Sequence, residues 1–167
     1  LYVYTLVSGR FREGWIPDNF FGAVVMPKLN KDLRLVTKFK TFSNVVLKTA
    51  ALPDVAYYID GVFYNRGLEV IDIDVLREVI GETWADVFVK KDGSGRGMGV
   101  TKLPIKVISK DIFREIGNGV IQSPIQQHNF FEEIIPGSVA TVRATTVKDT
   151  NGKISLRASY LRIGRKD

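Results

Sequence analysis

The sequence contains no cysteine and a single histidine, His128. Without cysteine there is no disulfide framework, no thiolate metal site and no thiol nucleophile, and an intracellular, cytoplasmic location is expected. One histidine also argues against a multi-histidine zinc centre. The side chains left for chemistry are therefore lysine, arginine, carboxylates and amides.

Long apolar runs are also missing. No stretch approaches the roughly 18 apolar residues that cross a bilayer, so no membrane span is expected. The first residues, LYVYTLVSGRFR, lack the basic start and the cleavage site of a signal peptide. With 45% hydrophobic and 25% charged residues, the chain has the composition of a globular domain that buries a core.

Lysine and arginine outnumber aspartate and glutamate by 24 to 18, so the net charge is +6 and a phosphate-bearing partner is expected. Two modest basic clusters, NKDLRLVTKFK and RIGRKD, lack the interleaved aromatic side chains of a nucleic-acid stacking surface. A basic pocket for a nucleotide or an anionic substrate explains the charge equally well. The glycines and lysines that stand together at the end of one strand favour a nucleotide and no nucleic acid as partner, because nucleic-acid binding would need only dispersed charge. A basic nucleic-acid-binding module is the alternative.

Local patterns predict a small α+β unit in the middle of the chain. The dipeptide Asp60-Gly61 separates two runs of strand-forming residues, which is the strongest hairpin signal present. Apolar residues at helical spacing follow a capping Asp72 and predict a helix that ends near Gly81. A strand, ADVFVKK, and a returning edge strand, VTKLPIKVI, enclose a glycine-rich loop.

The segments on either side of this unit also carry patterns that predict helices and strands. Upstream, Pro17 precedes an expected short helix, and the apolar spacing predicts a longer helix over about 38–48. Downstream we expect a helix between Ser109 and Gly117, a strand over 119–122, a helix over about 126–134, and two long strands joined around Asn151-Gly152.

The stretch VFVKKDGSGRGMGV places glycine at alternate positions directly after two lysines. Glycine lacks a Cβ atom and adopts positive φ, so successive backbone N–H groups can point at an anion. Lys90 at the end of the strand would bring a positive charge to the same phosphates. The loop is neither a Walker A motif nor a G-x-G-x-x-G fingerprint, and a strand follows it. Taken alone, it is as consistent with a flexible hairpin tip as with a phosphate cover.

The order of the motifs resembles the ATP-grasp superfamily, most closely the sugar-transfer-associated ATP-grasp family linked to polysaccharide biosynthesis. The resemblance rests on a lysine before a helix (KTF), on DVFVKKDGSGRGMGV, on VIQSPIQQH, and on T-x-R-x-x-T in SVATVRATTV. It covers most of the chain from about Pro17 and is strongest from Val87 to Gly164. It implies an α+β, ATP-grasp fold with a leading helical part over 1–51, a lid over 52–118, and the start of a second nucleotide-binding subdomain over 119–167.

The resemblance also implies which residues contact ATP. Lys38, with Lys40 as a nearby rival, and Lys90 would bind α- or β-phosphate oxygens. Arg143 and Arg162 are the implied catalytic residues, because a guanidinium suits a transferring phosphoryl group or a substrate carboxylate. The other implied contacts are Gly93, Ser94, Gly95, Gly97 and Gly99 in the loop, Gln122, Ser123 and Ile125 at the adenine, and Gln127 or His128 near the ribose.

The activity that the resemblance implies is ATP-dependent ligation of a carboxylate through an acyl-phosphate, with Mg²⁺ as cofactor. The Mg²⁺ ligands are expected beyond Asp167, so the ATP-grasp fold is expected to be truncated at its C-terminal end. A non-catalytic nucleotide-binding or regulatory domain is an alternative that needs no metal ligands. For Arg143 the structural alternative is a core-strand arginine paired with Glu132 or Glu133.

Overall fold

A computed structural model describes residues 2–95 and 97–164. The chain divides into two compact units, Leu1–Ser123 and Pro124–Asp167, which are called unit 1 and unit 2 below. The first unit extends past the expected boundary at residue 118 because the next strand lies inside its sheet.

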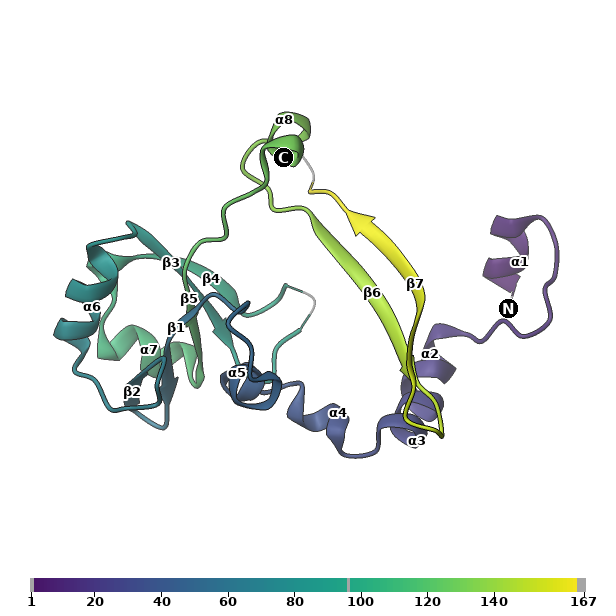
Figure 1. Ribbon diagram of the computed structural model, residues 1–167, viewed down its shortest axis with the longest axis horizontal. Helices are drawn as coiled ribbons and strands as arrows, with labels where there is room; N and C mark the ends of the chain where they lie inside the picture. Colours follow the sequence, from purple (N-terminus) through teal and green to yellow (C-terminus); the bar gives the residue numbers. More distant parts are fainter. Residues whose placement is uncertain (1, 96, 165–167) are drawn as a thin grey trace. The chain divides into compact units, whose positions relative to one another are not determined.

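Unit 1 is built on a five-stranded antiparallel sheet with the order β2-β1-β5-β3-β4 (Figure 1). Each strand coincides with a run of strand-forming residues, and β4 occupies an edge, which accommodates its proline. Mixed helices and antiparallel strands agree with the α+β class. The strands are β1 (Asp54–Ile59), β2 (Val62–Asn65), β3 (Asp86–Lys91), β4 (Val100–Pro104) and β5 (Gly119–Gln122).

The predicted hairpin at Asp60-Gly61 is confirmed. Asp60 has φ +49° and Gly61 has φ +88°, and β1 and β2 pair directly on either side of them. A two-residue turn with positive φ at both central residues has a twist that matches the twist of the two flanking strands.

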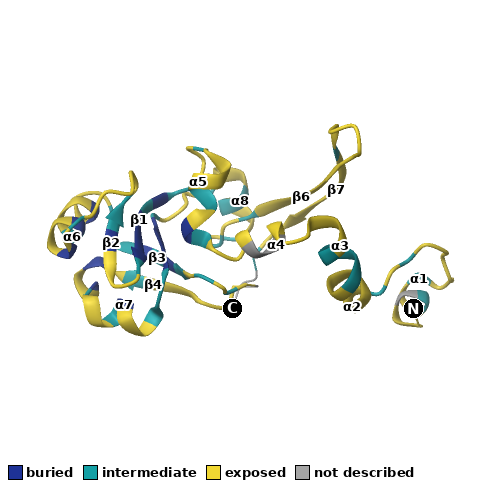
Figure 2. Ribbon diagram, turned by 90° about the horizontal axis from the view of Figure 1, so that it is seen from below, coloured by how far each residue is buried: buried dark blue, intermediate teal, exposed yellow. Residues whose placement is uncertain are grey.

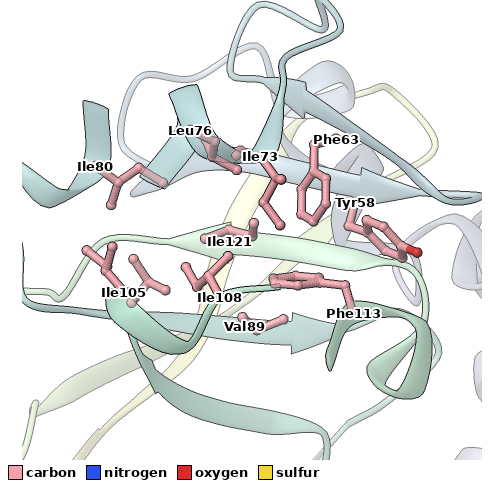
Figure 3. Close-up of a cluster of buried hydrophobic side chains, with 12 residues drawn as sticks. Tyr58, Phe63, Ile73, Leu76, Ile80, Val89, Ile105, Ile108, Phe113 and Ile121 are labelled. Atoms are coloured by element: carbon pink, nitrogen blue, oxygen red, sulfur yellow. The ribbon is translucent and has the colours of Figure 1, made fainter. Parts of the chain in front are cut away.

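The core lies on one face of the sheet, here called the inner face. Side chains from the strands meet α6 (Ile73–Gly81), η3 (Ile105–Val107) and α7 (Lys110–Ile116), as Figure 3 shows. Phe113 of α7 is fully buried, and its ring centroid is 5.2 Å from that of Tyr58 and 5.0 Å from that of Phe63. This aromatic cluster joins the sheet to α7.

The two core helices begin and end as their sequences predict. Asp72 accepts a hydrogen bond from the Asp74 backbone N–H, and the Ser109 hydroxyl accepts one from the Ile112 N–H. These side chains satisfy backbone donors that the first helical turn leaves free. Gly117 ends α7 with φ +84°.

The opposite face of the sheet, here called the outer face, is partly covered by η2 (Lys40–Phe42) and α5 (Ser43–Leu47). Thr41 of η2 is buried against it. The helix predicted over 38–48 is shorter than expected because Phe39 is extended and Lys48 takes a left-handed conformation.

Short helices occupy the first part of the chain: α1 (Tyr2–Ser8), α2 (Asp18–Phe20), η1 (Phe21–Val25), α3 (Met26–Asn30) and α4 (Leu33–Val36). Pro17 stands directly before α2, as predicted. The three elements α2, η1 and α3 contain no buried residue. Across residues 2–95 and 97–164, no helix has both the length and the apolar character needed to cross a membrane.

Unit 2 contains α8 (Asn129–Ile134) and an antiparallel hairpin of β6 (Thr141–Lys148) and β7 (Ile154–Arg162). The predicted turn is confirmed, with Gly152 at φ +81° and Asp149 accepting from the Asn151 backbone N–H. Every residue of β6 is exposed (Figure 2). The α8 helix starts later than residue 126 because His128 takes the capping position.

Candidate functional site

The outer face of β3 presents the residues most suited to bind a ligand. Strand alternation directs Val87 and Val89 into the core and leaves both fully buried, so Phe88 and Lys90 face the other way. Both of the outward residues are half-buried. The Lys90 ammonium has neither a hydrogen bond nor an ion pair to any residue that the structure describes. A half-buried cation without a partner is suited to receive an anion.

The sheet register adds a third residue to this face. Gln122 at the end of β5 lies opposite Phe88. Only 7% of its surface is exposed, and its Nε2 donates a 2.6 Å hydrogen bond to Asp54 Oδ1. The outer face therefore carries an aromatic ring, an amide and an ammonium on two neighbouring strands; this set, Phe88, Lys90 and Gln122, is called the outer-face site.

The glycine-rich loop begins at the same end of β3 and is fastened at its root by Asp92. Its Oδ1 accepts from the backbone N–H groups of Lys40 (2.6 Å) and Thr41 (3.1 Å). Its Oδ2 accepts from the Thr41 hydroxyl at 2.6 Å. The Gly93 N–H donates in turn to the Lys38 carbonyl at 2.9 Å. The root of the loop is therefore held, which a wholly mobile hairpin tip would not be.

The Lys40 ammonium adds a second fastening. It donates to the carbonyls of Lys91 (2.5 Å) and Ser94 (2.8 Å) and to the Ser94 hydroxyl (2.8 Å). Burial lowers the pKa of Lys40, the charge of Asp92 opposes that change, and the charge of Lys90 adds to it. The sequence did not decide between Lys38 and Lys40. In the structure Lys40 reaches the loop with its side chain, while Lys38 contributes its backbone carbonyl.

Three of the four loop glycines have backbone conformations that favour glycine. Gly93, Gly97 and Gly99 have φ values of +71°, +83° and +72°. A Cβ atom at Gly99 would also lie 2.7 Å from the Ser94 side chain. Gly95 has neither constraint, since its φ is not positive and open space surrounds it. The alternate spacing in the sequence is therefore a structural requirement at three positions.

Removal of the Lys40 ammonium should loosen the root of the loop. We expect Lys40→Met to speed the hydrogen exchange of the Gly93 amide by about 10- to 100-fold, because hydrogen bonds to a charged group contribute about 1.5–3 kcal/mol. Lys38→Met is the matched control, since the exposed Lys38 side chain is two residues away and its carbonyl is retained. Equal exchange rates in the two variants, measured by NMR, would show that Lys40 does not hold the loop.

The remaining residues implied for adenine and ribose lie at the end of β5 and in unit 2. The Ser123 N–H donates to the Pro53 carbonyl at 2.9 Å, which closes the end of β5. In unit 2, Ile125 is exposed, and Gln127 Nε2 donates to the Ser138 carbonyl at 2.8 Å. His128 Nδ1 accepts from the Phe130 N–H at 3.2 Å and caps α8.

The expectation of a core strand around Arg143 is wrong. Within residues 2–95 and 97–164, strand β6 pairs with β7 alone, and both of its faces are exposed. Arg143 Nη1 donates to the Tyr160 hydroxyl at 3.0 Å, and among the described residues it forms no ion pair with Glu132 or Glu133. Arg162, at the end of β7, lies opposite Thr141 and on the same face of the hairpin as Arg143.

Three residues of this region were not predicted from the sequence: Asp54, Phe88 and Asp92. The alternation in DVFVKK was a sufficient signal for Phe88, because it shares a face with Lys90. No local pattern marks the two aspartates, whose partners lie far away in the sequence.

Three hollows in unit 1 are lined by residues outside the outer-face site and outside the loop. One of about 580 Å³, lined in part by Trp84, Asp86 and Pro104, is at the opposite end of β3 from the glycines. Within the described ranges, no group of three or more histidine and acidic side chains is placed to hold a metal ion. Comparison of the chain with protein-family models, curated proteins and solved structures found no match.

Proposed function

We propose that unit 1 binds a nucleoside triphosphate, ATP, on the outer-face site, with the phosphates beside Lys90 and the glycine-rich loop. One observation carries the proposal: Lys90, which is half-buried and has no partner among the described residues, lies next to a loop whose root is held by Asp92. The first supplies charge, and the second orders the backbone next to it before a ligand arrives.

Charge at this end of β3 favours an anionic group. Lys90 and Lys40 are close enough for each to feel the other's charge, and Lys40 is already occupied by loop carbonyls. A phosphate beside Lys90 would neutralise that ammonium and accept from N–H groups of the glycine loop. Lys40 would then act by holding the loop, and Lys90 by direct contact with phosphate oxygens.

The other two members of the outer-face site suit a base. The half-buried ring of Phe88 offers a flat apolar surface, and any base can stack on an aromatic ring. Gln122 lies beside that ring and offers a polar amide to the edge of a base. A base stacked on Phe88 and a phosphate beside Lys90, two residues farther along β3, would together match the chemistry of a nucleotide.

The finer proposal follows from the sequence resemblance: an ATP-grasp ligase acting in polysaccharide or cell-surface sugar biosynthesis. A substrate carboxylate oxygen would attack the γ-phosphorus, ADP would leave, and an amine or other nucleophile would then displace phosphate from the acyl carbon. The protein would contribute charge neutralisation and positioning. Among the described residues no three acidic or histidine side chains gather as metal ligands, and no step is assigned to the metal.

Calorimetric titration tests the proposal. The chain is expected to bind ATP at one site and AMP more weakly, because AMP lacks the β- and γ-phosphates. ATP binding with turnover of a carboxylate would support the ligase, whereas ATP binding without turnover would assign a nucleotide-binding domain. Absence of ATP binding, or salt-sensitive binding of duplex DNA alone, would contradict the proposal.

A further inference from the structure

Asp54 is a carboxylate buried in unit 1, with 2% of its surface exposed. Its Oδ1 accepts from Gln122 Nε2 at 2.6 Å, and its Oδ2 accepts from the Tyr57 hydroxyl at 3.2 Å. The Asn44 side-chain amide donates to that same hydroxyl oxygen, also at 3.2 Å. Because the tyrosine has a single proton and its oxygen already accepts from Asn44, the proton is directed to Asp54.

The environment of Tyr57 keeps these donor and acceptor roles fixed. Burial raises the pKa of Tyr57; the Asn44 hydrogen bond opposes that rise, and the charge of Asp54 adds to it. The phenol therefore remains a donor at neutral pH. With Asp54 as the acceptor at both of its oxygens, Gln122 has to present its NH₂ group and not its carbonyl oxygen.

The amide of Gln122 is thereby oriented. Its two polar atoms diverge from one carbon, so binding of Nε2 by Asp54 on β1 turns Oε1 away from that strand. Among the described residues Oε1 has no hydrogen-bond partner, and no buried side-chain polar atom there is unsatisfied, so Oε1 reaches solvent. Strand β3 flanks β5 on the side away from β1 and places Phe88 opposite Gln122. A fixed acceptor therefore stands beside the aromatic ring of the outer-face site.

We infer that Asp54 is a positioning residue through which Gln122 selects a purine with a 6-amino group over a purine with a 6-oxo group. An amino group donates to the fixed Oε1, whereas an oxo group would place a second acceptor against it. The inference rests on the proposed function, because it specifies the base of the nucleotide that the outer-face site binds.

Competition between ATP and inosine triphosphate tests the inference. The two ligands carry the same sugar and phosphates, and the bases differ in the 6-substituent and the N1 proton. The wild-type chain is expected to prefer ATP by on the order of tenfold or more. In Asp54→Asn the preference should fall to within about threefold or reverse, since Tyr57 still donates to the asparagine oxygen and the asparagine NH₂ then faces Gln122, which turns the Gln122 amide over. Asp111→Asn removes the same charge from an exposed position in α7 and should keep the wild-type preference.

A second variant covers the case in which Asp54→Asn does not fold. Gln122→Met removes the acceptor while Asp54 stays in place, and it too should lose the preference for ATP. Equal binding of the two triphosphates by the wild-type chain overturns the inference, and so does an unchanged preference in whichever variant folds. If the wild-type chain binds neither triphosphate, the proposed function itself has failed, which is a different result from binding without discrimination.

Discussion

Substitution of Lys90 by methionine is expected to weaken ATP binding by about 10- to 100-fold. Lys90 has no partner among the described residues and lies beside the root of the glycine-rich loop, so its ammonium is free for a phosphate. A hydrogen bond between charged groups contributes about 1.5–3 kcal/mol, and each 1.4 kcal/mol is a tenfold change in affinity. Methionine keeps much of the apolar stem, so the change reports the charge more than the packing.

Lys91→Met is the control for this result. Lys91 is the next residue of β3, is exposed, and faces the opposite side of the sheet. Both variants lose one positive charge from nearly the same position, so a general electrostatic effect would weaken both equally. Calorimetric titration of ATP should show a large loss only for Lys90→Met. Equal losses would contradict a direct phosphate contact by Lys90.

The largest expected change in stability comes from Phe113→Ala. Phe113 is fully buried against the rings of Tyr58 and Phe63 and joins α7 to the inner face of the sheet (Figure 3). Truncation of a buried phenylalanine to alanine costs about 3–5 kcal/mol, because apolar contacts are lost and a cavity remains. We expect the free energy of unfolding of unit 1, measured by urea denaturation, to fall by that amount.

Phe42→Ala is the matched control for the core prediction. Phe42 is also in unit 1 but is 53% exposed, and its ring makes an edge contact with Phe39. Its truncation should change the free energy of unfolding by less than about 1 kcal/mol. A similar loss of stability in the two variants would mean that the inner face is not the core of the unit.

Features set by neighbouring residues were predictable from the sequence. The Asp60-Gly61 turn, the caps at Asp72 and Ser109, and the ending at Gly117 all depend on residues a few positions apart. Each follows from local backbone chemistry, so a short window of sequence is enough to find it.

Features that depend on distant residues were not predictable. Asp92 binds residues more than 50 positions earlier, and the Asp54–Gln122 hydrogen bond joins residues 68 positions apart. Both bonds exist because the sheet order places β5 between β1 and β3 and η2 over the outer face. The exposure of Arg143 was missed for a related reason, since alternation along β6 does not reveal how many strands pair with it.

Binding of a nucleotide to the outer face of unit 1 is tested most directly by the amide chemical shifts of ¹⁵N-labelled protein during ATP addition. Saturable shifts are expected at Phe88 and Lys90, at the loop glycines and at Gln122, while the inner-face residues of α6 should be unchanged. Shifts confined to the far end of β3, or to unit 2, would contradict it.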